Sequence, residues 1–444
     1  MSAAPVDPGA ANLDDLLGLV DPRVGIVREL SRVSKGADEP NLPIVYHARL
    51  SHFDLRRGEE SERSAAGKGR TGEQAMASAL GEAVERYCAS LYDPSRFVRA
   101  SADELAGAKV RPAECVLYHR DQYAREDFAY REPDDAAEIS WVEGRALPGG
   151  EPVHLPASLT FLSFVGERGS ELFTPPTSNG LGAGPDLDSA VLGGLLEVVE
   201  RDAFLIAWLN RLPASEVDLA GPRAPWAPMV EHYRRFGVEL RVFDVTTDLP
   251  IAVMLCLAID RSGEGPAAVA GLGSHLDPPR AIEKAVMEVC QVRPGVARTY
   301  ALSSPEDRLA GYEDVETLED HSAFFTDGER LGELAFLLDT GRRVAVDELP
   351  ARSTGDAAGD LTRAVADLAA AGHQVVYRDL TTPDLAGIAV RAARVLVPGL
   401  QPIHFGHRQE RLGGDRLYEV PRALGHAERR RRPDEINPCP HPLA

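Results

Sequence analysis

The chain has 444 residues, of which 44% are hydrophobic and 26% are charged, and its formal net charge is -21. This length and composition are those of a folded protein with a large core. The negative charge excludes a general affinity for nucleic acid or anionic membranes, so a polyanion would need a dedicated pocket.

Targeting and metal signals are weak. The N-terminal stretch lacks a basic start and an apolar segment, and no apolar run approaches about 20 residues, so we expect a cytoplasmic protein. The cysteines are scattered without paired metal-ligand spacing, which argues against a zinc site. We expect disorder in residues 1–12, a catalytic body over residues 1–428 and a separate tail over residues 429–444.

The first elements expected are a helix-like lead-in over residues 13–30 and a strand over residues 43–54. A longer helix follows over residues 71–92, because Thr71 and Gln74 have the spacing of a capping box. Its apolar positions recur at helical spacing, and they are Met76, Leu80, Ala83, Val84 and Tyr87. Ser78, Glu82 and Glu85 share the opposite face, which alone is explained equally well by solvent exposure and by ligand binding.

Glycines precede this helix in a pattern that resembles a nucleotide-binding loop. Gly67, Gly69 and Gly72 match GxGxxG, but no clear strand precedes them and no βαβ unit follows, which argues against a dinucleotide-binding domain. The chain also lacks the GxxxxGK[ST] pattern of a P-loop. Lys68, between two of these glycines, is a mobile positive charge suited to a phosphate.

The dominant stretch is residues 177–208, in which a glycine-rich loop from Asn179 to Gly184 leads into a helix that is apolar almost all round. Such a helix belongs in a protein interior, yet it carries Glu197, Glu200 and Arg201. Buried carboxylates are costly unless they are paired, hydrogen-bonded or bound to metal. The sequence therefore predicts that something neutralises these acids.

A helix followed by two strands appears twice, and each helix is ended by a glycine. Each copy also carries an aspartate followed by two threonines, so we expect a duplicated layer of one α/β body. The copies comprise residues 226–236, 238–245 and 250–259, and residues 361–371, 373–380 and 388–397.

Acidic residues on three helices carry the chemical signal. Two helices contain ExxER, and a third, expected to begin at Asp277 and Pro278, contains ExxQxR. Residues three apart lie on one helix surface, so each ExxE pair presents two carboxylates. Two such pairs facing one cavity would repel each other unless divalent cations joined them, and magnesium combines few carboxylates with phosphate oxygens.

Two late features are weaker. His404 and His407 have no cysteine or carboxylate company in the sequence, so packing or surface roles are favoured over metal binding. The terminal PCPHP segment has proline at every second position, which forbids a helix or central strand and leaves an extended segment. A disordered end is the alternative for this tail.

Three blocks of this sequence resemble the nucleotide-binding blocks of the YcaO family. They are GKGRTGEQAMASALGEAVERY, TSNGLGAGPDLDSAVLGGLLEVVERDAF and RAIEKAVMEVCQVR. LVDPRVGIVREL near the N-terminus and VLVPGLQPIHFGHRQERLGG near the C-terminus also resemble the family, so the likeness covers most of the chain. It implies an α/β (α+β) fold with acidic helices around an ATP and magnesium site, and commonly a homodimer.

The resemblance also implies individual roles. Magnesium ligands would be Glu82, Glu85, Glu197 and Glu200. Nucleotide or phosphate contacts would come from Lys68, Ser78, Asn179, Arg201, Glu288, Gln291 and Arg293. One departure is Ser189, since the family often has Glu at this position; either Asp188 substitutes or one ligand is absent.

The PCPHP tail resembles that of azoline-forming members, whose tail lies near the active site. The resemblance thus implies ATP-dependent cyclodehydration of Cys, Ser or Thr in a ribosomal precursor peptide, with a separate leader-recruiting partner. Catalytic residues would be Arg201, Pro438, Pro440, Pro442 and Ala444. The alternatives are thioamide or amidine formation, or a catalytically silent nucleotide-binding scaffold.

Overall fold

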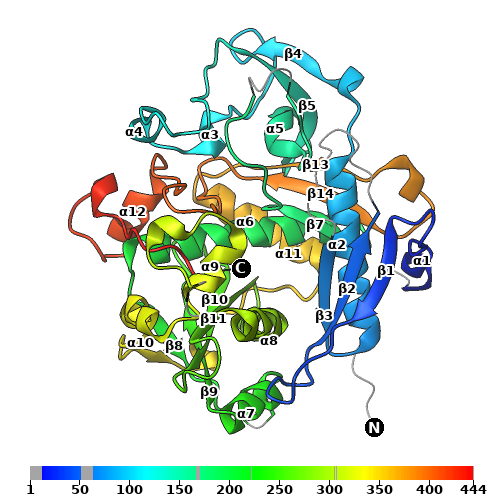
Figure 1. Cartoon of the computed structure of the whole chain (residues 1–444). Coiled ribbons are helices and arrows are strands. Elements are labelled where there is room, and N and C mark those ends of the chain that lie inside the picture. The colour runs from blue at the N-terminus through cyan, green and yellow to red at the C-terminus, as the bar shows by residue number, and fades with distance from the viewer. Residues whose placement is uncertain are drawn as a thin grey trace. The chain divides into compact units, whose positions relative to one another are not determined.

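The structure is a computed structural model that describes residues 13–51, 64–166, 171–221, 223–304, 306 and 308–443 (Figure 1). The disorder expected of residues 1–12 and the role expected of Ala444 concern residues outside this set. The fold is mixed α/β, as predicted.

The chain forms two compact units. The first unit comprises residues 1–33, 44–198 and 354–399, and the second comprises residues 34–43, 199–353 and 400–444. Helix α6 (Leu187–Asn210) is continuous, with its residues through Val198 in the first unit and the rest in the second. The helix that carries the central ExxER motif therefore belongs to both units.

The first unit holds two antiparallel sheets, with strand orders β1-β2-β3 and β4-β5-β13-β14-β7 and with β6 paired to β5. Apolar residues of α2 pack into the core beside the first sheet. The bounds are α1 (Leu13–Leu17), β1 (Val27–Arg32), β2 (Ile44–Leu50), β3 (Ser64–Gly69), α2 (Gly72–Ser90), β4 (Val98–Ser101), α3 (Ala113–Val116), α4 (Arg120–Tyr123), β5 (Glu138–Leu147), β6 (Pro152–Pro156), α5 (Ala157–Thr160), β7 (Leu181–Gly184), α11 (Ala357–Ala370), β13 (Val375–Asp379) and β14 (Arg391–Leu396).

The second unit holds one sheet with strand order β11-β10-β9-β8-β12, against which α8 packs (Figure 1). Its core lies where α7 and α8 cover β9, β10 and β11. The bounds are β8 (Ser215–Val217), α7 (Ala227–Arg235), β9 (Val238–Asp244), β10 (Ala252–Asp260), β11 (Ala268–His275), α8 (Pro278–Leu302), α9 (Leu318–Phe324), α10 (Ala335–Leu338), β12 (Arg343–Val344) and α12 (Arg416–Ala423).

Both copies of the predicted helix and strand pair are confirmed as elements. They are α7, β9 and β10 in one copy and α11, β13 and β14 in the other. Gly237 and Gly372 follow the two helices with φ of 76° and 87°, a left-handed conformation that favours glycine at a helix end. The copies do not share one layer, however, because the first lies in the second unit and the other in the first.

Three strand-to-helix connections share one register, in which a strand glycine lies directly against the following helix. A Cβ on Gly67, Gly182 or Gly273 would overlap the helix backbone eight and twelve residues further on. The helix begins five residues after each glycine, at Gly72, Leu187 and Pro278. Each of these strands, β3, β7 and β11, lies at the end of its sheet's strand order.

This register places the acidic motifs at equivalent points of three helices. Fifteen residues after the three glycines stand Glu82, Glu197 and Glu288, and eighteen residues after them stand Glu85, Glu200 and Gln291. Because backbone packs on backbone at each crossing, the glycines fix how far each helix lies from its strand. The equivalent helix positions therefore lie at equivalent heights above their strands.

Two local predictions were wrong. Residues 27–30 belong to strand β1 rather than to a helix, and a strand, β3, does precede the GxGxxG segment. Short alanine and glycine runs conceal this strand, since they lack the β-branched residues typical of one. The case against a dinucleotide-binding fold still holds, because β3 pairs antiparallel with β2 and no parallel βαβ unit forms there.

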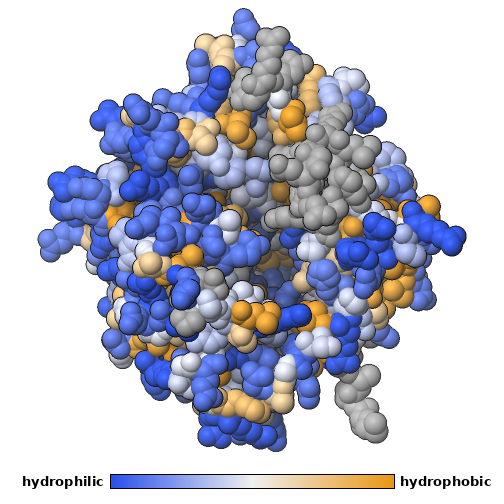
Figure 2. All heavy atoms as spheres, in the orientation of Figure 1, coloured by the Kyte–Doolittle hydropathy of each residue, from blue (hydrophilic) through white to orange (hydrophobic). Residues whose placement is uncertain are grey.

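Hydrophilic residues cover most of the face seen in Figure 2, with hydrophobic residues in small groups. Within the described parts of the chain, the helices are all too short or too polar to cross a membrane.

Candidate functional site

Three carboxylates gather in the first unit, from α2 and the N-terminal part of α6. Glu82 accepts from the Ala66 amide at 3.1 Å, and Glu197 accepts from the Gly180 amide at 2.9 Å. Glu85 accepts from the Ala183 amide of β7 at 2.7 Å. Backbone N–H groups of β3, of β7 and of the turn before β7 thus orient the three acids.

Glu85 has a strongly raised pKa. Burial, together with the negative charges of Glu82 and Glu197, raises its pKa to about 8. Arg86 offers the nearby positive charge, but it pairs with Glu82 at 2.8 Å. At Glu85, burial and the like charges therefore outweigh the positive charge of Arg86.

The glycine-rich loop before α6 is held by a residue that the sequence did not single out. Arg394 of β14 is 3% exposed, and it donates to the carbonyls of Asn179 at 2.6 Å and Thr177 at 2.8 Å. Burial lowers its pKa to about 10, against the effect of Glu197. This role of Arg394 is visible only in its contacts with the loop carbonyls. The small residues that surround Arg394 in the sequence do not indicate it.

Asn179 lies in this loop with its side-chain Oδ1 buried and without a hydrogen-bond partner. Native proteins satisfy nearly all buried polar groups. An amide without a partner next to oriented backbone groups fits a ligand contact, as the sequence predicts for this residue.

The second unit presents a different group of charges, from the C-terminal part of α6 and from α8. Burial and the charge of Glu288 raise the pKa of Glu200, whereas Arg201, Lys284 and a hydrogen bond from the Ser274 hydroxyl lower it. The Arg201 guanidinium lies 3.8 Å from Glu200. Carboxylates here are mixed with positive charges.

The structure places the other predicted nucleotide residues in varied surroundings. Lys68 lies half-buried in β3, opposite Val45 of β2, and Ser78 is exposed on α2. Glu288 and Gln291 are half-buried on α8, and Glu288 accepts from the Leu272 amide at 3.5 Å. Their contacts with nucleotide stay predictions.

Arg293 is 3% exposed, which makes it the least accessible of the predicted phosphate residues. It pairs with Glu39 and, at 3.6 Å, with Asp260, and it lies 5.3 Å from the Tyr233 ring centroid. Tyr233 also donates to Glu39 at 2.5 Å. This network supports an architectural role that ties residues 34–43 to the core of the second unit.

The start of α6 bears on the departure at Ser189. Asp186 accepts from the Ser189 amide at 2.8 Å, which caps the helix. Asp188 is exposed. Relative to the strand glycine before it, Asp186 occupies the same position as the N-caps Thr71 and Asp277 of the other two acidic helices. Ser189 is therefore the third residue after the cap of its helix.

The C-terminal tail caps α6. Asn437 donates through its backbone to the Leu209 carbonyl at 2.8 Å and through its side chain to the Trp208 carbonyl at 3.2 Å. Arg431 donates to the Asn210 carbonyl at 2.9 Å. These carbonyls have no partner within the helix itself, so the tail completes the helix that carries the central motif.

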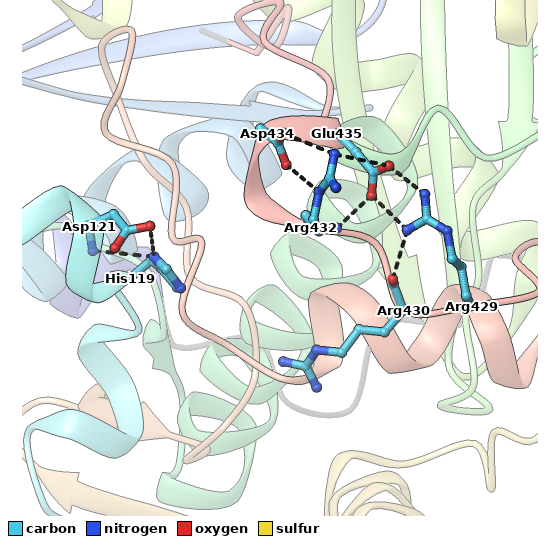
Figure 3. A network of polar contacts seen from close by, with 7 residues as sticks. All are labelled: His119, Asp121, Arg429, Arg430, Arg432, Asp434 and Glu435. Carbon is cyan, nitrogen blue, oxygen red and sulfur yellow. Dashed lines mark hydrogen bonds and ion pairs between the residues drawn. The ribbon is translucent and has the colours of Figure 1, made fainter.

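The arginine run at the start of the tail, residues 429–432, is engaged in ion pairs (Figure 3). Arg429 and Arg432 both contact Glu435, and Arg432 also contacts Asp434. Arg430 pairs with Asp415 at 2.7 Å. The run therefore fixes the start of the tail rather than forming a basic surface patch.

The tail itself is largely buried in the second unit. Pro438 is exposed, whereas Pro440 and Pro442 are buried. The Trp208 indole donates to the Cys439 carbonyl at 2.9 Å. The alternative of a disordered end does not describe residues 433–443.

Magnesium and a nucleotide fit the residues present. Glu82, Glu85 and Glu197 supply carboxylate oxygens, the ligands that a hard divalent cation takes, although within the described residues no three such side chains are placed close enough to hold a metal ion. The positive charges around Glu200 suit an anionic ligand, and the buried Oδ1 of Asn179 can accept from a ligand that donates.

Comparison with known proteins agrees with these features. Residues 66–401 match the YcaO cyclodehydratase family, which is described as ATP- and Mg2+-binding. An uncharacterized protein of Methanothermobacter thermautotrophicus is 33% identical over 358 residues, which cover 78% of this chain and 84% of that protein. An uncharacterized protein from the tfuA 3′ region of Rhizobium leguminosarum bv. trifolii is 31% identical, over 61% of each chain.

Solved structures of a heterocyclase and of a YcaO protein are also similar to this chain. A heterocyclase in complex with substrate and cofactor has a TM-score of 0.82 and 28% identity and covers 97% of this chain, which spans 57% of the heterocyclase's length. A YcaO protein from Methanopyrus kandleri, bound with AMPPCP and Mg2+, has a TM-score of 0.62 and 27% identity to this chain. The similarity covers 84% of this chain and 86% of that protein's chain.

Proposed function

The chain belongs to the YcaO cyclodehydratase family, which binds ATP and Mg2+, and we propose that it is an ATP-dependent cyclodehydratase acting on a precursor peptide. The carboxylate cluster of the first unit, with Glu85 at its centre, carries this proposal. A carboxyl pKa raised by burial and by neighbouring acids is one of the features by which functional sites are recognised.

We assign the magnesium ligands to the two ExxE pairs. Glu82 and Glu85 come from α2, and Glu197 and Glu200 come from α6. When bound, Mg2+ would neutralise the triphosphate and withdraw charge from the transferring phosphoryl group. The protein's own part is to hold Glu82, Glu85 and Glu197 through backbone amides before the cation arrives.

The anionic end of the nucleotide needs donors and positive charge. We assign this role to Arg201, which lies beside Glu200, and to the side-chain NH2 group of Asn179, the donor end of its amide. Lys68, Ser78, Glu288, Gln291 and Arg293 complete the proposed set. Arg293 would act from behind, through the packing of α8, because its guanidinium is engaged by Glu39.

The proposed reaction forms a five-membered ring in the peptide. A Cys, Ser or Thr side chain loses its proton and attacks the preceding carbonyl carbon, and the carbonyl oxygen receives the γ-phosphoryl group of ATP. The amide nitrogen then loses its proton as phosphate leaves, which gives the thiazoline or oxazoline. Positioning and charge neutralisation suffice for such a transfer, so no covalent enzyme nucleophile is needed.

We further propose that the tail prolines, Pro438, Pro440 and Pro442, order the active site together with Ala444. Deleting residues 438–444 should then leave ATP affinity nearly unchanged while turnover falls. The peptide would be delivered by a separate leader-binding partner protein, and the chain would act as a homodimer. Unchanged turnover in the truncated protein would remove the tail from the mechanism.

The decisive experiment incubates the protein with ATP, magnesium, a partner protein and a precursor peptide encoded beside it. We expect the peptide to lose one water per ring. A gain corresponding to oxygen replaced by sulfur, dependent on a sulfur donor, would instead indicate thioamide formation. Partner-dependent ATP hydrolysis that Glu200→Gln abolishes would exclude a catalytically silent scaffold.

A further inference from the structure

Three histidines from separate segments of the second unit meet around the end of the tail. His321 lies on α9, His404 follows the β14 region in the chain, and His441 lies between two tail prolines. The rings of His321 and His441 are stacked with centroids 4.0 Å apart, and those of His404 and His441 lie 5.0 Å apart. All three side chains are buried.

Backbone groups fix the protonation of two rings. The Gly406 N–H donates to Nε2 of His321 at 2.9 Å, so this nitrogen carries no proton and Nδ1 must donate to the His441 carbonyl at 2.8 Å. Nε2 of His441 then donates to the His404 carbonyl, also at 2.8 Å. These three bonds form a closed clasp joining α9, residues 404–406 and the tail.

The clasp holds only neutral rings. A proton on Nε2 of His321 would face the Gly406 N–H, and a proton on Nδ1 of His441 would have no acceptor, since that atom is buried without a partner. Burial lowers the pKa of His321 to about 4 and also lowers that of His441. The clasp is therefore closed at neutral pH.

The tail end that the clasp holds lies beside the central helix. The His441 ring meets the Phe204 ring of α6 edge-on at 5.9 Å between centroids. Phe204 lies three residues after Arg201 on α6, so the two side chains share one surface of the helix, against which the His441 ring packs. Arg201 in turn lies 3.8 Å from Glu200.

We propose that His441 is a positioning residue, which holds the end of the tail against α6 and thereby sets the place of Arg201. Capping by Asn437 anchors the start of the tail, whereas the histidine clasp anchors its end. The effect on turnover rests on the proposed function, but the effect on the tail does not.

The test compares His441→Gln, whose amide keeps an N–H near the place of Nε2, with His441→Asn, whose shorter amide does not reach. His426→Asn serves as control, since His426 lies in the same unit and makes none of the clasp contacts. Cys439 reports on the tail because it is buried and its thiol pKa is raised to about 12. Maleimide labelling of Cys439 in the full-length protein is followed by peptide mass spectrometry.

We expect His441→Asn to label at least about tenfold faster than the wild type, the equivalent of one lost hydrogen bond, with His441→Gln and the control near wild type. His321→Leu removes the other donor, leaves the tail sequence intact, and should expose Cys439 equally. Wild-type labelling rates in both His441→Asn and His321→Leu would overturn the clasp.

Turnover then tests the link to Arg201. For His441→Asn we expect kcat for ATP hydrolysis to fall about tenfold with an ATP KM within about twofold of wild type, and His441→Gln should restore kcat. Fast labelling with unchanged kcat would overturn the positioning role. Absence of turnover in the wild type with every precursor would count against the proposed function alone, because the labelling result stands without it.

Discussion

Glu85 and Glu200 occupy equivalent positions of the two ExxER motifs, but they lie in different units and meet different charges. In the first unit, Glu85 lies among Glu82 and Glu197, and its pKa rises to about 8. In the second unit, burial and the charge of Glu288 also raise the pKa of Glu200, but Arg201, Lys284 and Ser274 oppose this rise. The motif alone therefore does not determine the charge of its surroundings.

This difference indicates a division of work along one helix. The first unit offers carboxylate oxygens, which are the ligands that a hard divalent cation takes. The second unit offers positive charge and hydrogen bonds, which suit phosphate oxygens. Equivalent positions of the three acidic helices have diverged, since Glu85 and Glu200 on two of them correspond to Gln291 on the third.

The largest expected effect separates the two acids by activity. Glu85→Gln and Glu200→Gln should each lower ATP turnover at least about 100-fold, because both remove charge directed at the transferring phosphoryl group. Magnesium titrations should differ: Glu85→Gln should raise the magnesium requirement strongly, and Glu200→Gln less so. Equal magnesium dependence of the two variants would contradict the division.

The register of the glycines gives the next largest effect. Gly182→Ala should destabilise the protein by about 2 kcal/mol, because its Cβ would overlap the backbone of Ala190 and Gly194. Gly193→Ala is the matched control, since this exposed helix residue has 4.0 Å of room and should gain up to about 1 kcal/mol. Chemical denaturation measures both, and similar values for the two would refute the close packing.

Metal removal should reveal how much the buried, ionised Glu85 destabilises the first unit. The raised pKa of Glu85 means that its ionised form is disfavoured in the folded state, so stability of the metal-free protein falls as pH rises from about 4.5 to 8. In EDTA at pH 8, the Glu85→Gln variant should therefore melt several degrees above the wild type. At pH 4.5 the two proteins should melt at the same temperature. Thermal scans that show no pH-dependent gap would contradict this reading.

Histidines of the second unit should show the opposite pH sign. The lowered pKa of His321 means that its contribution to stability is complete above pH 6.5 and is lost as pH falls toward about 4. His321→Leu should accordingly lose stability at pH 7 but little at pH 4. A constant difference between variant and wild type would indicate that protonation plays no part.

Loop positioning gives the smallest effect. Arg394→Lys loses the two-armed contact with the Asn179 and Thr177 carbonyls, since lysine presents a point charge rather than a fork. We expect the ATP KM to rise about tenfold while kcat changes little. Arg391→Lys is the control, as Arg391 contacts the Val390 and Ile388 carbonyls instead.

Much of this was predictable from residue patterns. The capping box at Thr71 and Gln74, the N-cap at Asp277 and the helix-ending glycines act locally, so short stretches reveal them. Strand β3 was missed because small residues pack it against a helix rather than against a core. Arg394, the clasp at His441 and the burial of Arg293 depend on residues far apart in sequence, which spacing alone does not bring together.

The three glycine crossings have a consequence for how this protein tolerates change. Where side chains separate a helix from a sheet, each core substitution shifts the helix by a fraction of its own size, and a site on that helix drifts. Here backbone meets backbone at Gly67, Gly182 and Gly273, so the spacing is set by atoms that mutation cannot resize. The acidic positions should thus be robust to variation nearly everywhere in the surrounding core and brittle at three glycines.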